Sequence, residues 1–390
     1  MCLLSFTSVP TTTSNGVITE IIPLPWYLEQ INVAGAWEIS KGLPNITIAI
    51  IDSGIDFNHP ELNHSSWLNS NEVPNNNIDD DLNGYIDDIH GWDFVNNDNN
   101  TGNDILDPIH YHGTFIAGII ASKHDDSGIL GISPEIKIMS LRIINVEKLL
   151  ENPGIFSEAI DYAVNNGAEI ISTSIQMPLG IPGLRSSIQR AVENNIPFVA
   201  VTGNTYNSEG GGRNSVSFPG AYSETIAVGA SNIKYEKADY SNFGSSIELV
   251  APVGDEDYET RNQTIRSTEL NSGFNYGYGT SYASPQVAAV IALMKSVRYN
   301  ISVSDIRNIL HNTAIDINEK GWDEFTGYGI VNASAAVVKA KNYVLSTTKK
   351  NLPFPFPYMT YINQILCLLA IVTLRSLKRL RKLKDWEKID

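Results

Sequence analysis

The sequence predicts an α/β fold in which a mostly parallel β-sheet carries helices on both faces. Residues 45–51 become a continuous apolar run, which is typical of a strand buried on both sides. From residue 136 onward, short apolar segments alternate with longer helical patterns. Such alternation favours right-handed crossovers between parallel strands. We therefore expect three layers, with the sheet between two layers of helices.

The individual elements follow in chain order. A short helix is expected at 28–39, ahead of the strand at 45–51, and a tightly packed helix of small and apolar residues at 112–121. The alternating region then predicts strands at 136–143, 168–175, 196–201 and 225–230, with helices at 156–165 and 183–194. Three helices complete the domain, at 286–297, 303–312 and 332–343.

Composition narrows the class of protein. With 390 residues, 42% of them hydrophobic, the chain can bury a large core in one domain. A net charge of -16 argues against a nucleic-acid partner, because a phosphate backbone would be repelled, whereas an acidic surface suits calcium. The two cysteines, Cys2 and Cys367, predict neither a disulfide framework nor a thiolate metal site. We expect a monomer.

The two ends of the chain differ from its body. Residues 1–24 form a short N-terminal segment, 25–344 the folded domain, and 345–357 a linker. Residues 358–374 are uncharged and mostly apolar, at the lower limit of length for a transmembrane helix, and a basic tail follows at 375–390. A basic flank favours the cytoplasm, so we expect a single-pass cell-membrane protein with its acidic domain outside. The alternatives are a helix docked on the domain or lying in the membrane interface, and a cytoplasmic protein.

Ser281 is a candidate nucleophile. It lies in the stretch 279–285, directly before the apolar run at 286–297, and Pro285 suits a first helical turn. A hydroxyl placed there feels the positive end of the helix. The simpler alternative is an N-cap serine, because a serine attacks only when a neighbouring base takes its proton.

Two other residues could activate that serine. Asp52 ends the apolar strand at 45–51, and the carboxyl ends of central strands are where ligands bind in α/β sheets. His112 stands at the mouth of the helix expected at 112–121. Taken singly, the aspartate could be a turn residue and the histidine structural. Together they supply the base and the orienting carboxylate that Ser281 needs.

An Asn- and Asp-rich segment at 69–104 contains half of a calcium-binding loop. Asp79, Asp81 and Asn83 alternate before a glycine, and the backbone carbonyl of Tyr85 falls at the next ligand position. Because His90 replaces the usual closing glutamate, Asp88 or Asp87 must complete the shell. The alternative is a solvated turn region.

Three motifs in this order resemble the subtilisin-like serine proteases: Asp52-Ser53-Gly54, His112-Gly113-Thr114 and the 279–285 stretch. The resemblance extends from Trp26 to Val338. It implies that Ser281 attacks a peptide carbonyl, that His112 transfers the proton, and that Asp52 orients the imidazole. It also implies that the side-chain amide of Asn204 stabilises the oxyanion.

The resemblance further implies a substrate-binding wall at Ser174, Ile175 and Gln176, with Ser217 at the base of the pocket for the P1 side chain. Gln176 and Met177 replace two glycines that are usual in the family, so their side chains could narrow the cleft. Tyr111 and Phe115 also depart from the pattern around His112 without affecting the triad. A second calcium site is implied at Glu61 and Asp125.

The function expected from these features is a calcium-stabilised serine endopeptidase that works through an acyl-enzyme. A narrower version is a processing protease that trims leader or pro-peptides from exported peptides. A hypothesis of a different class is a catalytically silent domain that only binds peptides, which would predict loss of a triad or oxyanion residue. A further hypothesis gives residues 21–25 a small inhibitory pro-segment role.

Overall fold

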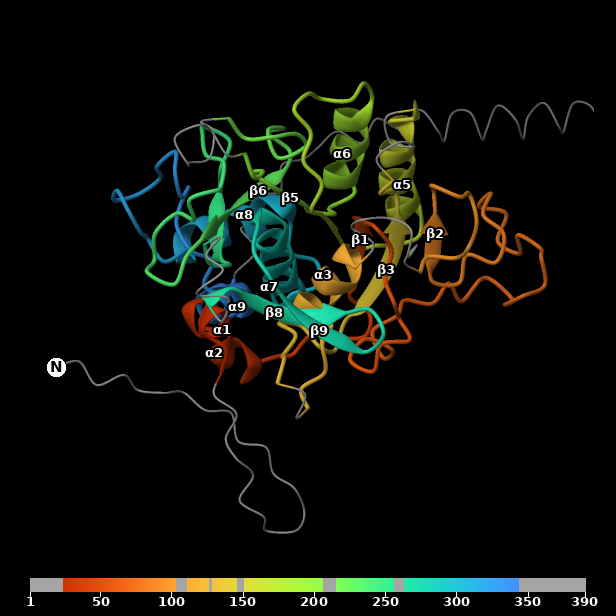
Figure 1. Cartoon of the computed structure of the whole chain (residues 1–390), viewed down its shortest axis with the longest axis horizontal. Helices are drawn as coiled ribbons and strands as arrows, with labels where there is room; N and C mark the ends of the chain where they lie inside the picture. Colours follow the sequence, from red (N-terminus) through yellow and green to blue (C-terminus); the bar gives the residue numbers. More distant parts are fainter. Residues whose placement is uncertain are drawn as a thin grey trace, which may run out of the picture. The chain divides into compact units, whose positions relative to one another are not determined.

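The computed structural model of the protein describes residues 24–102, 111–125, 128–145, 151–205, 215–255 and 263–343 (Figure 1). These residues belong to one compact unit that ends at Tyr343. The expected N-terminal segment 1–24 falls almost wholly outside the described residues, and the linker 345–357, the apolar segment 358–374 and the basic tail 375–390 fall entirely outside them. Within the described part, no helix has both the length and the apolar character needed to cross a membrane.

The central sheet has seven strands in the order β2-β3-β1-β4-β5-β6-β7. Every neighbouring pair is parallel. The strands are β1 (Thr47–Asp52), β2 (Gly91–Asp93), β3 (Lys137–Arg142), β4 (Ile170–Thr173), β5 (Phe198–Val201), β6 (Ile226–Ser231) and β7 (Leu249–Pro252). From β1 the chain crosses to β2 at one edge of the sheet and returns through β3 beside β1, and from β4 onward it proceeds strand by strand to the other edge. This reversal beside β1 opens a crevice at the carboxyl ends of the strands.

Strand β1 explains why its sequence is apolar without alternation. Ile48 and Ile50 belong to a core shared with α3 (His112–Ala121) and α7 (Ser284–Val297). Ala49 and Ile51 belong to a second core, shared with α5 (Gly154–Asn165) and α6 (Leu184–Glu193). Helices α5 and α6 lie side by side on their face of the sheet (Figure 1). The expected three-layer α/β fold is therefore confirmed.

Helix α7 is the central element of the larger core. Its residues from Ser284 to Lys295 are all buried, and it contacts β4, β5 and β6 as well as α3 and α9 (Ala333–Lys341). Because the helix is surrounded by protein, its apolar residues cover every side rather than one stripe. Helix α8 (Val303–Thr313) packs beside α9, and a hairpin of β8 (Ile265–Glu269) and β9 (Gly273–Gly277) covers α3.

The expected single helix at 28–39 is wrong. The chain forms two short helices instead, α1 (Trp26–Gln30) and α2 (Val33–Trp37). Asn32 separates them in a left-handed conformation with φ 53°, which no continuing helix adopts. The expected strand at 168–175 is also shorter, because β4 ends at Thr173 and the chain beyond it becomes a wall of the crevice.

Candidate active site

The functional side chains gather where three adjacent strands end. Asp52 is the last residue of β1, Ser174 follows β4, and Asn204 comes three residues after β5. Since β1, β4 and β5 are neighbours in one parallel sheet, their carboxyl ends open at the same edge. The sheet alone therefore brings together residues far apart in the sequence.

Asp52 and His112 form a buried pair. The Nδ1 atom of His112 lies 2.8 Å from Asp52 Oδ1, and the two side chains are 14% and 1% exposed. A carboxylate can only accept, so His112 Nδ1 carries the proton and the Nε2 atom of the neutral ring keeps its lone pair. The backbone N–H of Ser53 donates to the same Asp52 oxygen at 2.8 Å. The imidazole is thus held in the tautomer of a general base.

Two effects oppose each other at His112. Burial lowers the pKa of the imidazole, but the charge of Asp52 and the hydrogen bond to it raise the pKa, and the net pKa lies above the usual 6.5. The folded protein therefore binds this proton more tightly than the unfolded chain does. The resulting stabilisation is present below pH 6.5 and is lost as the pH rises through the raised pKa.

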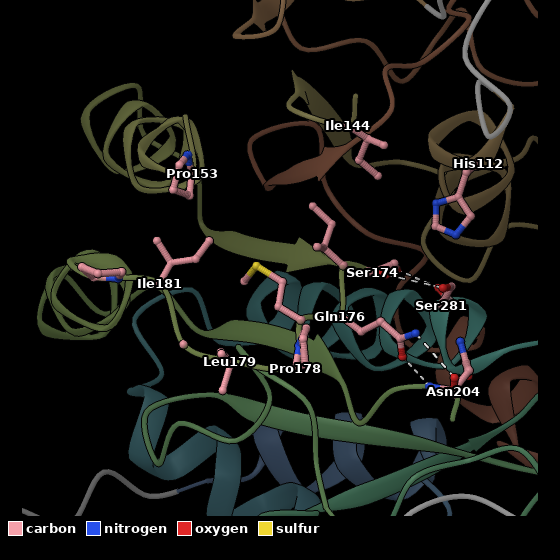
Figure 2. A pocket seen from close by; sticks show the side chains of 14 residues that line it. His112, Ile144, Pro153, Ser174, Gln176, Pro178, Leu179, Ile181, Asn204 and Ser281 are labelled. Atoms are coloured by element: carbon pink, nitrogen blue, oxygen red, sulfur yellow. Dashed lines mark hydrogen bonds between the residues drawn. The ribbon is translucent and has the colours of Figure 1, made fainter. Parts of the chain in front are cut away.

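Ser281 lies in a short 3₁₀ turn, η2 (Thr280–Tyr282), just before α7 rather than within its first turn. Its hydroxyl donates to the carbonyl of Ser174 at 3.5 Å, and the Ser174 hydroxyl donates back to the Ser281 carbonyl at 2.8 Å. Within the described part of the chain, no hydrogen bond joins this hydroxyl to His112. Both side chains face one cavity (Figure 2), and such bonds often tighten only when substrate is present.

The side chain of Asn204 is fixed by one end of its amide. Its Oδ1 atom accepts from the backbone N–H of Thr280 at 2.7 Å and from the Thr280 hydroxyl at 2.9 Å. With the oxygen occupied in this way, the amide nitrogen points toward Ser281 (Figure 2). The arrangement offers an N–H donor beside the candidate nucleophile.

A cavity of about 600 Å³ runs along this edge of the sheet. His112, Ser281 and Asn204 lie at one end, and the rest of the lining is mostly apolar (Figure 2). Its apolar side chains come from Ile144, Pro153, Ile175, Met177, Pro178, Leu179, Ile181 and Pro182. Such a surface suits an extended chain with apolar side chains bound next to a small polar centre.

Three of the four residues predicted to bind substrate line this cavity. Ser174, Ile175 and Gln176 line the cavity, whereas the lining does not include Ser217. The Ser217 hydroxyl instead accepts from the amide of Asn242 at 3.3 Å.

Comparison with known proteins agrees with this geometry. The sequence pattern of the Subtilase family matches residues 44–329, which is more than half of the chain. The chain belongs to the subtilase family. Halolysin of Haloferax mediterranei is 33% identical over 310 residues, which are 79% of this chain and 52% of halolysin. The chain therefore spans about half the length of that relative.

Other subtilases match over more of their own length. The major intracellular serine protease of Bacillus subtilis is 30% identical over 286 residues, 73% of this chain and 78% of that protein. Subtilisin DY of Bacillus licheniformis is 29% identical over 294 residues, 75% of this chain and 90% of that protein.

The Asn- and Asp-rich segment folds around a cluster of three carboxylates. Oxygen atoms of Glu72, Asp81 and Asp88 all lie within 4.8 Å of one another. Burial raises the pKa of Asp88, while hydrogen bonds from Tyr162, Asn83 and Asn69 work in the opposite direction. Within the described part of the chain, no lysine or arginine forms an ion pair with these three carboxylates.

The structure distinguishes between the residues predicted for this calcium loop. Asp88 joins the cluster, whereas Asp87 accepts from the backbone N–H groups of Asn76 and Asn77. Asp79 accepts from the N–H groups of Asn83 and Gly84, so it caps the turn rather than joining the three carboxylates. The Asn83 amide donates to Asp81 and Asp88, and the Tyr85 ring packs against Tyr162 of α5. Glu72, which no spacing rule indicated, completes the cluster.

The second predicted calcium site is less compact. Glu61 is buried and Asp125 is exposed, and neither belongs to the three-carboxylate cluster. The ammonium group of Lys123 lies against the same loop as Glu61, where it donates to the carbonyl of Pro60 and, at 2.9 Å, to Asn63. This site stays a prediction.

Sequence reasoning missed two supporting residues. Thr280 orients Asn204 through both its N–H and its hydroxyl, and Tyr282 packs against His112 and Phe115, with ring centroids 5.7 and 4.3 Å away. Phe115 thus fills the core behind the imidazole. The only sequence signal for Thr280 and Tyr282 was that they flank Ser281.

We expect Asp52→Asn to lower the pKa of His112 from above 6.5 to below it, because burial remains while the opposing carboxylate charge is lost. The pKa is measured by proton NMR of the imidazoles in a Ser281→Ala background, which prevents self-digestion. His112→Gln assigns the signal, and the other histidines are internal controls. An unchanged His112 pKa in Asp52→Asn would contradict this electrostatic account.

Proposed function

We propose that this protein hydrolyses peptide bonds through a triad of Asp52, His112 and Ser281 and an acyl-enzyme intermediate. The single observation that carries the proposal is the buried Asp52–His112 hydrogen bond, which presents a basic nitrogen to the cavity containing Ser281. Family membership supports the same reaction. No other described residue is needed to supply a base.

The steps follow from the geometry. The Ser281 hydroxyl attacks the scissile carbonyl while His112 Nε2 takes its proton, and Asp52 stabilises the resulting imidazolium. The imidazolium then protonates the leaving amine, so the peptide C–N bond breaks and an ester with Ser281 remains. Water, deprotonated by His112 in turn, hydrolyses the ester and releases the acid.

Asn204 supplies a donor for the oxyanion formed in each attack. Its amide nitrogen is directed toward Ser281 because Thr280 holds its oxygen. A donor that is already oriented stabilises developing charge without reorganising during the reaction. The backbone N–H of Ser281 is the natural second donor.

A peptide-binding domain without catalysis is the alternative of a different class. It is disfavoured because Asp52, His112, Ser281 and Asn204 are all present. Trimming of leader or pro-peptides is a narrower form of the proposed activity. The support for it is the restricted cleft beside Gln176, which suits a selective protease.

We expect a fluorophosphonate probe to label the protein at Ser281 and Ser281→Ala to abolish labelling, whereas the control Ser186→Ala, at an exposed serine of α6, is labelled normally. Asn204→Ala should keep the nucleophile but lower kcat by about 100- to 1,000-fold, because one oxyanion donor is lost. Peptide hydrolysis measures kcat. A folded wild-type protein that stays unlabelled would favour the silent domain.

We propose further that the cluster of Glu72, Asp81 and Asp88 binds calcium. An ion ringed by oxygen ligands at about 2.3–2.6 Å brings those oxygens within about 5 Å of each other, and the cluster meets this spacing. Three carboxylates so close together repel one another unless a cation or protons neutralise them. Bound calcium would join the loop to α5, because Tyr162 donates to Asp88.

Calcium should therefore raise the melting temperature by roughly 3–5 °C at a hundredfold excess over its Kd, from about 2.7 kcal/mol of binding free energy. Calorimetry of the Ser281→Ala protein with calcium or with chelator measures the shift. We expect Asp81→Asn to remove most of it and Asp98→Asn, at an exposed residue of the same segment, to retain it. Equal shifts in the two variants would refute this site.

We also propose that residues 358–374 anchor the protein in the cell membrane, with the catalytic domain outside the cytoplasm. The support is in the sequence: an uncharged, mostly apolar segment followed directly by a basic tail. A cytoplasmic location is the alternative. The catalytic chemistry does not depend on either.

The full chain should sediment with lipid vesicles even at 1 M salt. At that ionic strength the Debye length is about 3 Å, so attraction between the basic tail and anionic lipids is screened and only the insertion of apolar residues retains the protein. A chain that ends at Tyr343, the last residue of the compact unit, should stay in the supernatant while still reacting with the fluorophosphonate probe. Release of the full chain by salt would point to surface attachment through the basic tail.

A further inference from the structure

We propose that Gln176 closes the pocket for the P1 side chain, so that this enzyme cleaves after small residues such as glycine, alanine and serine. The inference rests on the proposed function and specifies its substrate class. Its starting point is the side chain of Gln176, which crosses the crevice from one wall to the other (Figure 2).

The position of the P1 pocket follows from the site. The P1 residue is the one that carries the scissile carbonyl. When that carbonyl lies between the Ser281 hydroxyl and the Asn204 amide, the P1 side chain points into the gap between residues 174–177 and 202–204. These two segments extend β4 and β5, which are paired neighbours in the sheet. Any P1 side chain must enter between them.

Gln176 is held in this gap by two hydrogen bonds to one residue. Its side-chain oxygen accepts from the backbone N–H of Asn204 at 2.5 Å, and its side-chain nitrogen donates to the Asn204 carbonyl at 3.5 Å. The side-chain amide therefore occupies both backbone groups of Asn204. Such a two-point contact fixes an otherwise flexible side chain across the pocket.

Gly203 shows how little space remains behind that amide. A Cβ atom built at Gly203 would lie 2.5 Å from the Ser217 hydroxyl and 2.7 Å from the Gln176 side-chain oxygen. The two oxygens therefore lie close together against Gly203, on the side where a side chain at that position would point. Gln176 lines the cavity, whereas Ser217 does not.

The far end of the gap is closed as well. The N–H of Met177 donates to the carbonyl of Phe218 at 2.8 Å, and the N–H of Phe218 donates back at 2.9 Å. The N–H of Ser217 in turn donates to the carbonyl of Thr202 at 2.8 Å, so residues 217–218 connect the two walls through backbone bonds, and a long side chain cannot pass beyond Gln176. The pocket is bounded by a side chain in front and by backbone behind.

A large P1 side chain would have to displace Gln176 and break both hydrogen bonds to Asn204, the proposed oxyanion donor. The cost would therefore fall on the transition state as well as on binding, and kcat should decrease together with a rise in KM. A hydrogen atom, a methyl group or a hydroxymethyl group leaves Gln176 in place.

The test compares peptides that differ only in P1, alanine or phenylalanine, with wild type, Gln176→Ala and Gln176→Met. Gln189→Ala is the matched control, since Gln189 is an exposed glutamine on α6 that donates to Glu224, outside the cavity lining. Wild type should prefer alanine in kcat/KM by at least about tenfold. Gln176→Ala should raise kcat/KM for phenylalanine by about 10- to 100-fold.

Gln176→Met separates occupied volume from hydrogen bonding. Methionine fills similar space without the bonds to Asn204, so the preference for alanine should stay within about threefold of wild type. The inference is overturned if wild type already prefers phenylalanine, or if Gln176→Ala leaves the P1 preference unchanged. A wild type that neither reacts with the fluorophosphonate probe nor cleaves any peptide would instead overturn the proposed function.

Discussion

The buried carboxylate of Asp52 is the constraint on which the site depends. A charge that is 1% exposed is costly without fixed donors, and here Ser53 and His112 both donate to Oδ1, while Oδ2 is buried without a hydrogen-bond partner among the described residues. The imidazole reaches Asp52 because α3 starts against the end of β1. At Gly113 a Cβ atom would lie only 2.3 Å from the carbonyl of Gly54, so glycine is required for this approach.

The remaining catalytic parts are held by bonds between loops rather than by one element. Ser174 and Ser281 exchange hydrogen bonds between hydroxyl and carbonyl groups, and Thr280 binds the oxygen of Asn204. These bonds join the ends of β4 and β5 to the turn that precedes α7. Since α7 is buried against the same strands, the turn has little freedom to move. The donor and the nucleophile are therefore positioned before substrate binds.

The sequence predicted the parts whose signal is local. The buried run before Asp52, the helix after His112 and the small-residue turn at Ser281 each carry their own pattern, and all three lie where expected. Glu72 and Thr280 carry none, because their partners depend on how loops fold against each other. The break at Asn32 needed a left-handed residue that apolar periodicity does not show. β2 has three residues, too few for any periodicity to identify.

Gln176 links substrate selection to the catalytic apparatus. In the free enzyme its side-chain amide occupies the backbone of Asn204 and fills the P1 pocket at once. Enlarging the pocket therefore also frees the backbone that carries the oxyanion donor. In the proposed pocket one side chain both limits the size of the P1 residue and holds the backbone of Asn204, and only a side chain of similar volume without the amide would separate the two roles.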